Sequence, residues 1–136
     1  MKTTLGNIAF ISTGKSNVVD TTENGPYPFY DRSQQIKYSH RFLFDVPAAI
    51  IIPGEGTEFI PRMAYGKFDL HQRAYAIVPN ESVSAKYVYY VILNAHYYFS
   101  MVSTGSTVSS LRLDMFKNMP ISLPNYSIQL RIADVI

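Results

Sequence analysis

The sequence predicts an α+β fold: a single globular domain built on a mixed, strongly twisted β-sheet. The chain has 136 residues, of which 47% are hydrophobic and 16% charged, and this composition is typical of one folded domain with a sizeable core. Segments with strand character come mostly before segments with helical character, which favours an α+β arrangement over a doubly wound sheet. The run at 48–52 is continuous, apolar and β-branched, so we expect it to be a buried central strand.

The first half of the chain is expected to supply most of the strands. Short apolar or aromatic runs alternate there with Gly, Pro, Asn and Ser, a pattern typical of strands separated by turns and loops. The longest such loop is expected over residues 14–28. Besides the central strand, strands are expected through Phe10 and Ile11, over 38–44 with a hairpin bend, over 59–65 and over 68–78, the last two joined by a hairpin turn at Gly66 and Lys67.

The second half is expected to be mainly helical, with one long helix at about 85–102. Apolar residues recur there at helical spacing, and this pattern predicts one buried stripe. The members of the stripe are Val88, Ile92, Ala95, Phe99 and Val102. Tyr87, Tyr90, Asn94 and Tyr97 are expected to edge the other side of this helix.

The region from Ser103 to the end of the chain is predicted to hold a loop, two short helices and a strand between them. A Gly/Ser/Thr loop comes first, and a helical turn then places Leu111, Met115 and Met119 on one face. Pro120 is expected to end that turn and to precede a strand at 121–123. Ser127 is a plausible N-cap for the last helix, with an apolar stripe made by Ile128, Ile132 and Val135.

Composition and charge exclude several classes of protein. The net charge is only +2, so charge alone gives no strong signal for a polyanionic partner. The absence of cysteine excludes disulfides and thiolate zinc sites and suits a cytoplasmic protein. The longest apolar run, at 46–53, is too short to span a bilayer, and no apolar targeting segment follows Met1. We therefore expect a soluble, cytoplasmic chain.

Motifs for catalysis are few. The sequence contains neither a phosphate-binding Gly-x4-Gly-Lys-Ser/Thr loop nor a dinucleotide-binding Gly-x-Gly-x-x-Gly pattern. Asp69 and His71 lie two apart on an expected strand and so share a face, where they could act as a base with its orienter or as metal ligands. The sequence does not indicate which residue would supply a third metal ligand, and no metal site is predicted. Glu55 and Glu58 could form an acid/base pair, although a solvated pair is the simpler interpretation.

Two polar clusters have the side chains that recognition of nucleic acid needs, although solvated loops are the simpler interpretation from residue type alone. Arg and Gln are the side chains that read guanine and adenine edges bidentately in a major groove. The residues expected to contact bases are Arg32, Gln34 and Gln35 in one loop and His71, Gln72 and Arg73 on one strand. The residues expected to contact the phosphate backbone are Lys15, Lys37, Thr57, Arg62, Lys67, Ser106 and Thr107. Solvated loops, a protein-interaction module using the tyrosine-lined helix, and a metal-assisted enzyme using Asp69 and His71 remain as alternatives.

An ordered set of short motifs resembles the target-recognition domain of the specificity subunit of type I restriction–modification enzymes. Each motif is weak alone, and the order of the whole set is what makes the resemblance specific. The motifs are Leu5-Gly-x-Ile8, Gly14-Lys15, Tyr27-Pro-x-Tyr30, Ala49-Ile-Ile-Ile-Pro-Gly-Glu-Gly56, Phe68-Asp-Leu-His-Gln-Arg-Ala-Tyr75, Gly105-Ser-Thr, Leu111-x-x-Asp-Met, Pro120-Ile-x-Leu-Pro124 and Gln129-x-Arg-Ile-Ala-Asp134.

The resemblance implies a non-catalytic domain that binds one half of a bipartite double-stranded DNA sequence. It implies a separate methyltransferase subunit that carries S-adenosylmethionine, and a further subunit that performs ATP-dependent translocation and cleavage. On this chain no cofactor is expected, since S-adenosylmethionine, ATP and magnesium belong to the partner subunits. Residues 1–126 then form the recognition domain, and 127–136 begin a truncated spacer helix. The expected partners are duplex DNA, the methyltransferase subunit and a second copy of the chain.

Overall fold

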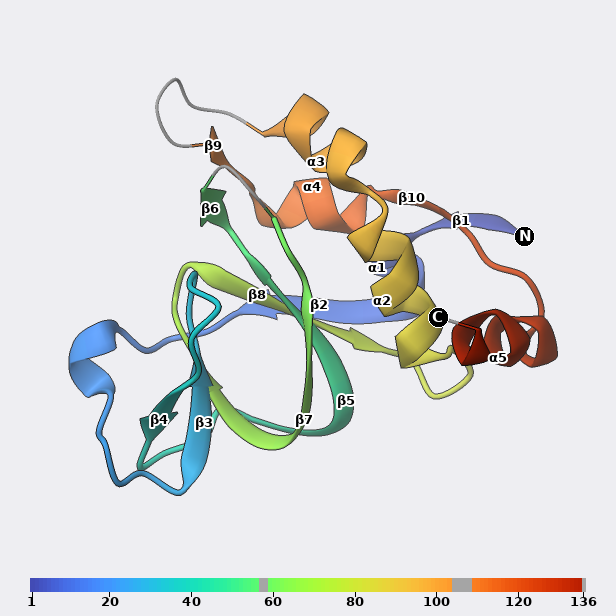
Figure 1. Cartoon of the computed structure of the whole chain (residues 1–136). Helices are drawn as coiled ribbons and strands as arrows, with labels where there is room; N and C mark the ends of the chain where they lie inside the picture. The colour runs from blue at the N-terminus through green and yellow to red at the C-terminus, as the bar shows by residue number, and fades with distance from the viewer. Residues whose placement is uncertain (57–58, 104–108, 136) are drawn as a thin grey trace.

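A six-stranded mixed sheet forms the centre of the fold (Figure 1). The computed structural model describes residues 1–56, 59–103 and 109–135. All neighbouring strands of this sheet are antiparallel except β3 and β7, which run parallel, so the predicted mixed sheet is confirmed. In spatial order the strands are β2 (Ala9–Thr13), β8 (Ala74–Pro79), β5 (Phe44–Pro53), β7 (Arg62–Leu70), β3 (Tyr27–Tyr30) and β4 (Lys37–Ser39).

Two small strand pairs join segments far apart in the sequence. The first strand, β1 (Lys2–Thr4), pairs with β10 (Pro120–Ser122), which confirms the strand expected after Pro120. The amino group of Met1 extends this contact by donating to the Leu123 carbonyl at 3.0 Å. The second pair joins β6 (Glu55–Gly56) to β9 (Ser109–Ser110).

The predicted central strand is the best-buried strand of the sheet. Ile50 and Ile52 on β5 pack into one core cluster, whereas Ala49 and Ile51 pack into another. Since successive side chains of a strand point to opposite faces, the two clusters lie on the two faces of the sheet. A strand covered on both faces reads as a continuous apolar run, and this explains why the sequence signal was so clear.

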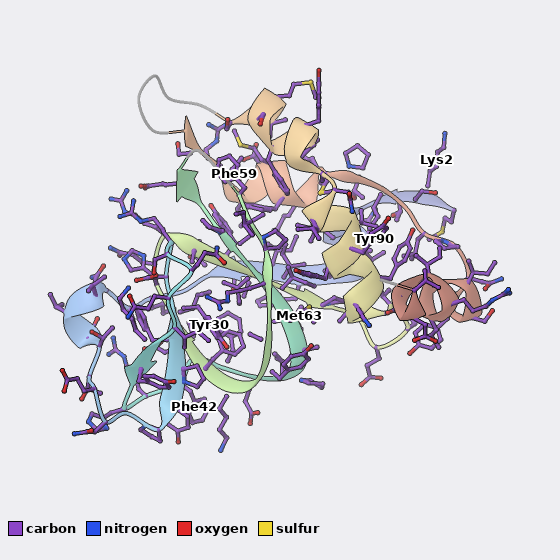
Figure 2. All side chains as sticks on the ribbon, in the orientation of Figure 1. Lys2, Tyr30, Phe42, Phe59, Met63 and Tyr90 are labelled. Atoms are coloured by element: carbon purple, nitrogen blue, oxygen red, sulfur yellow. The ribbon has the colours of Figure 1, made fainter. Side chains whose placement is uncertain are left out.

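The larger cluster lies between the sheet and the helices. In Figure 2, Phe59 lies beside this helical layer, whereas Tyr30 lies over the part of the sheet that the helices leave uncovered. The smaller cluster, on the opposite face, is built around Phe68, which stacks on Phe44 with ring centroids 4.9 Å apart. The helices are α1 (Leu5–Ile8), α2 (Ala85–Leu93), α3 (His96–Val102), α4 (Leu113–Lys117) and α5 (Tyr126–Asp134).

The prediction of one continuous helix over about 85–102 is wrong, because the helix is interrupted after Leu93. The Asn94 side-chain amide donates to the Tyr90 carbonyl at 2.9 Å and competes with the backbone for that acceptor. The chain then restarts as α3, and the predicted stripe survives the break, with Val88, Ile92 and Phe99 fully buried. Within the described residues, no helix is long and apolar enough to cross a membrane.

The prediction of a hairpin turn at Gly66 and Lys67 is also wrong. Both residues lie inside β7, where Gly66 has φ +73° and pairs with Val46. The register of β5 shifts just beyond this point, between Val46 and Ala49, so the glycine marks a bend within a continuous strand. The true turn comes at 71–73, and the segment expected as one strand over 68–78 is therefore divided between β7 and β8.

The apolar face predicted around the short helix α4 is confirmed, whereas the apolar face predicted for α5 is not the one that is buried. Leu111, Met115 and Met119 are all buried, as their spacing predicted. The predicted stripe of α5 is wrong, since Ile128 is 40% exposed and Val135 is 85% exposed.

The buried side of α5 instead carries Gln129 and Ala133. Gln129 Oε1 accepts from the Ser84 amide at 2.9 Å, and Nε2 donates to the Pro124 carbonyl at 2.8 Å. A buried amide with both ends hydrogen-bonded fixes the rotation of the helix. The N-cap is Asn125, whose Oδ1 accepts from Ile128 N at 3.1 Å, and not Ser127.

One buried carboxylate, near the C-terminal end of β7, joins three segments of the chain. Asp69 is 1% exposed and accepts from Ser16 Oγ at 2.8 Å and from Ser39 Oγ at 3.0 Å. Arg41 Nε lies 3.6 Å from the same carboxylate. Asp69 therefore ties the segment after β2 and the end of β4 to β7.

We predict that Asp69→Ala lowers the free energy of unfolding by about 2–4 kcal/mol, because the substitution leaves two buried hydroxyls without their acceptor. Urea unfolding followed by circular dichroism measures this. The matched control is Asp45→Ala on the neighbouring strand, an exposed carboxylate expected to change stability by less than about 0.5 kcal/mol. Equal losses in the two variants would contradict a structural role for Asp69.

Candidate nucleic-acid interface

The two clusters predicted to contact bases lie side by side at one end of the sheet, just beyond the C-terminal ends of β3 and β7. Since β3 and β7 run parallel and Tyr30 pairs with Leu70, the segments that follow the two strands leave the sheet together (Figure 1). The His71 amide donates to the Tyr30 carbonyl at 2.9 Å and holds the turn after β7 against the loop after β3. We call the loop 31–36 and the turn 71–73 together the recognition edge.

The prediction that His71, Gln72 and Arg73 lie on one strand is wrong, because they form the turn between β7 and β8. The His71 carbonyl accepts from Ala74 N at 3.1 Å, and His71 Nδ1 accepts from Arg73 N at 3.0 Å. These two hydrogen bonds close the turn. Gln72 and Arg73 are consequently exposed at its tip, and a turn tip reaches further from the sheet than a strand face does.

Glu55 connects the two parts of the recognition edge. Its Oε2 accepts from Arg32 Nη1 at 2.7 Å, and its Oε1 pairs with Arg73 Nη1. The Arg32 and Arg73 side chains are 50% and 58% exposed, against 19% for Glu55. The hydrogen bond from Arg73 and the positive charges of both arginines lower the pKa of the Glu55 carboxyl, which keeps it ionised.

Lys37 and Arg62, both expected to contact phosphate, also make contacts that support the loop. Lys37 Nζ pairs with Asp31, whose Oδ1 also accepts from Ser33 N at 2.8 Å. Burial raises the pKa of the Asp31 carboxyl, but the hydrogen bonds from Lys37 and Ser33 outweigh burial and lower it overall. Arg62 Nη1 donates to the Gln34 carbonyl at 2.7 Å, and its guanidinium lies 5.3 Å from the centroid of the Tyr30 ring.

The remaining predicted residues are spread around this edge. Gln34 and Gln35 are exposed on the loop. Lys15 is exposed in the segment that packs on the turn, where Gln72 Nε2 donates to Asn17 Oδ1 at 2.6 Å. Lys67 lies apart, at the bend of β7, with Nζ 5.0 Å from the centroid of the Phe42 ring. Thr57, Ser106 and Thr107 lie outside the described residues.

A hollow of about 410 Å³ opens between the loop, the turn and β6. Its walls include Asp31, Arg32, Glu55 and His71. Burial, followed by the charge of Arg32, lowers the pKa of the His71 imidazole below its usual range. The hollow is therefore lined by paired charges and a neutral imidazole.

The arrangement does not support the alternative in which Asp69 and His71 act as a pair. Asp69 is occupied by Ser16 and Ser39, whereas His71 Nδ1 accepts from the backbone of Arg73. Among the residues that the structure describes, no group of three or more His, Cys, Asp or Glu side chains could hold a metal ion. Glu58, the proposed partner of Glu55, lies outside the described residues.

Comparison with known proteins shows the family to which the chain belongs. Residues 1–136 match the family described as Type I restriction modification DNA specificity domain. The chain belongs to this family. The EcoDI specificity subunit of a type I restriction enzyme from Escherichia coli is 27% identical to this specificity domain over 130 residues, which are 96% of the present chain and 29% of the relative.

Solved structures share the fold of this specificity domain. The S subunit of a type I restriction–modification system from M. genitalium superposes with a TM-score of 0.81 at 18% identity, over 99% of this chain and 37% of that subunit. The HsdS subunit from Thermoanaerobacter tengcongensis gives 0.75 at 15% identity, over 99% of this chain and 36% of the other. The specificity domain therefore spans about a third of the length of the relatives it matches.

Sequence reasoning missed the role of Glu55 and the partners of Asp69. Arg32 and Arg73 are 23 and 18 residues from Glu55 in the sequence, and only the fold brings the three together. A signal was nevertheless present, because Glu55 is the single charged residue in a Pro-Gly-Glu-Gly turn directly after a buried strand. A charge placed there must lie at the rim of the sheet, where long side chains from other elements can reach it.

We predict that lowering the pH destabilises this domain through His71. Since burial lowers the pKa of His71 in the folded state, the unfolded chain binds a proton more readily, and stability is lost as the pH falls below about 6.5. The expected result is that His71→Gln, which offers an acceptor that does not titrate, flattens the pH dependence of urea unfolding above about pH 5, while His40→Gln, at an exposed histidine, does not. Identical profiles for the wild-type protein and His71→Gln would contradict this.

Proposed function

We propose that this domain binds double-stranded DNA sequence-specifically and acts as the recognition module of a type I restriction–modification system. The observation that carries the proposal is the meeting of Arg32, Gln72 and Arg73, from two separate elements, on one exposed edge. Arginine and glutamine can donate bidentately to guanine and adenine in the major groove. Membership in the specificity-domain family supports the same assignment.

The charges of the recognition edge suit a duplex. The cations in the recognition edge and in direct contact with it are Arg32, Lys37, Arg62 and Arg73, and the carboxylates there are Asp31 and Glu55, so an excess of positive charge remains next to an uncharged imidazole. Exposed cations attract the phosphate backbone and orient the protein on it. In this arrangement Gln34, Gln35, Gln72, Arg32 and Arg73 face the bases, and Lys15 is placed to contact the backbone beside them.

The domain is proposed to be non-catalytic and to work with a methyltransferase subunit in the cytoplasm. The chain spans only 29–37% of its relatives, so further parts of a full subunit are expected to supply the other half-site and the contacts with that partner. S-adenosylmethionine, ATP and magnesium are assigned to partner subunits. Association with a second copy through α5 would likewise provide a second recognition edge.

We predict that the protein selects one short duplex sequence from a randomised library, and that Gln72→Ala and Arg73→Ala relax the selection at particular base pairs. Each lost bidentate contact should cost about 1–3 kcal/mol on the preferred sequence. Lys15→Ala should weaken all sequences about equally and make the salt dependence shallower, since a phosphate contact carries no sequence information. Selection followed by titration at several salt concentrations measures both effects.

Lys86→Ala on α2 serves as the control for removing a cation outside the proposed interface, and we expect unchanged binding. Equal affinity for every duplex, or preference for single strands, would contradict the proposed function. An unchanged selected sequence in a folded Gln72→Ala variant would contradict the placement of the turn in the groove.

We also predict that the chain alone, purified from a host that lacks methyltransferases, transfers no methyl groups to DNA. The reason is that Asp69 and His71 are each engaged in structural hydrogen bonds. Incorporation of label from S-adenosylmethionine is the measurement, and a cognate methyltransferase subunit with a full-length specificity subunit is the positive control. Sustained turnover that His71→Gln abolishes would instead favour the enzyme hypothesis.

A further inference from the structure

The most unusual feature of the recognition edge is one carboxylate shared by two arginines from separate elements. Glu55 lies on β6, Arg32 on the loop after β3 and Arg73 on the turn before β8. Each oxygen of the carboxylate accepts a hydrogen bond from one arginine, so a single side chain holds two guanidinium groups close together. Among the described residues, no other side chain is hydrogen-bonded to both guanidinium groups.

Each arginine uses only one corner of its guanidinium in this contact. Both bind Glu55 through Nη1, and within the described part of the chain neither guanidinium has another hydrogen-bond acceptor. An arginine carries five N–H donors in a planar fork. With half or more of each side chain exposed, the remaining donors of Arg32 and Arg73 face solvent in an orientation that Glu55 holds.

The charge of Glu55 distinguishes between the acceptors that DNA offers. A phosphate is anionic and is repelled by a carboxylate a few ångströms away, whereas the O6 and N7 atoms of guanine belong to an uncharged base. An arginine held at one corner by a carboxylate can still donate two parallel hydrogen bonds to guanine from its free edge. The same carboxylate disfavours attachment of these arginines to the backbone of any sequence.

We propose that Glu55 is a specificity-determining residue that positions Arg32 and Arg73 to read guanine and hinders their use as phosphate contacts. The inference rests on the proposed function and deepens it. It adds a base identity, guanine, at the positions that these two arginines read. It also assigns a role in DNA selection to a carboxylate that itself has no attraction for the phosphate backbone.

Three variants of the full chain test this inference by library selection and by titration with a random duplex. Glu55→Gln removes the charge and keeps the shape. Glu55→Asp keeps the charge, but its side chain is one methylene shorter and cannot keep both contacts. The control is Glu81→Gln, which removes the same charge at an exposed position beyond the far end of β8.

For Glu55→Gln we expect tighter binding to random duplex, a salt slope steeper by about one, and roughly tenfold poorer discrimination between the selected and the random sequence. Glu55→Asp should lose discrimination without gaining affinity for random duplex. Glu81→Gln should match the wild-type protein. Thermal melting, monitored in parallel, should show that all three variants remain folded, since both glutamates lie at the surface.

The outcomes separate this inference from the proposed function. If the wild-type protein selects no sequence, the proposed function fails. If it selects a sequence but Glu55→Gln keeps the same sequence, discrimination and salt slope, the role of Glu55 is refuted while DNA recognition stands. A selected sequence without guanine at the positions relaxed by Arg32→Ala and Arg73→Ala would also overturn the inference. Should Glu55→Gln fold poorly, Glu55→Asp still decides, because retained discrimination in that variant refutes positioning.

Discussion

The parallel pairing of β3 with β7 is the constraint on which the recognition edge depends. Every other neighbouring pair in the sheet is antiparallel, and antiparallel strands would have sent the loop 31–36 and the turn 71–73 to opposite ends. The parallel contact is only a few residues long, from Phe29 and Tyr30 to Asp69 and Leu70. Asp69 reinforces it from inside the fold through its hydrogen bonds to Ser16 and Ser39, so a buried carboxylate maintains the geometry of an exposed site.

Asp69 and Glu55 differ in burial, and this difference decides how much each contributes to stability. Asp69 is almost wholly buried, and loss of its partners would leave a desolvated charge, so the surrounding segments cannot rearrange at low cost. The ion pairs of Glu55 involve half-exposed arginines, and such pairs contribute only about 0–1 kcal/mol to stability. Arg32 and Arg73 can therefore adjust to a ligand without unfolding the edge, while the shared carboxylate still favours one arrangement of the two. The contact therefore biases the orientation of the two arginines and leaves them free to adjust to a ligand.

Strands and helices whose burial follows a local pattern were predicted from the sequence. Features that depend on contacts between residues far apart in the chain were not. The apolar run of β5 and the stripe of Val88, Ile92 and Phe99 were readable because burial on a strand or a helix has a fixed period. The break at Asn94 and the rotation of α5 were missed because single amide side chains, not the apolar pattern, determine them. For the site, the two clusters that were predicted separately do meet. Their placement on a turn and their connection through Glu55 were not predictable, since these features depend on strand pairing and on contacts between residues far apart in the chain.

The arrangement of the layers separates the recognition edge from the two ends of the chain. In Figure 1 the turn and the loop lie on one side of the sheet, whereas the N-terminal pair of β1 with β10 and the helix α5 lie on the other. The helical layer and the larger core cluster occupy the space between the two regions. A protein that bound α5 would consequently leave Gln72 and Arg73 accessible, and a duplex at the turn would leave α5 uncovered. Under the proposed function, DNA and a protein partner would therefore occupy separate surfaces of one small domain, as a recognition module serving a separate enzyme requires.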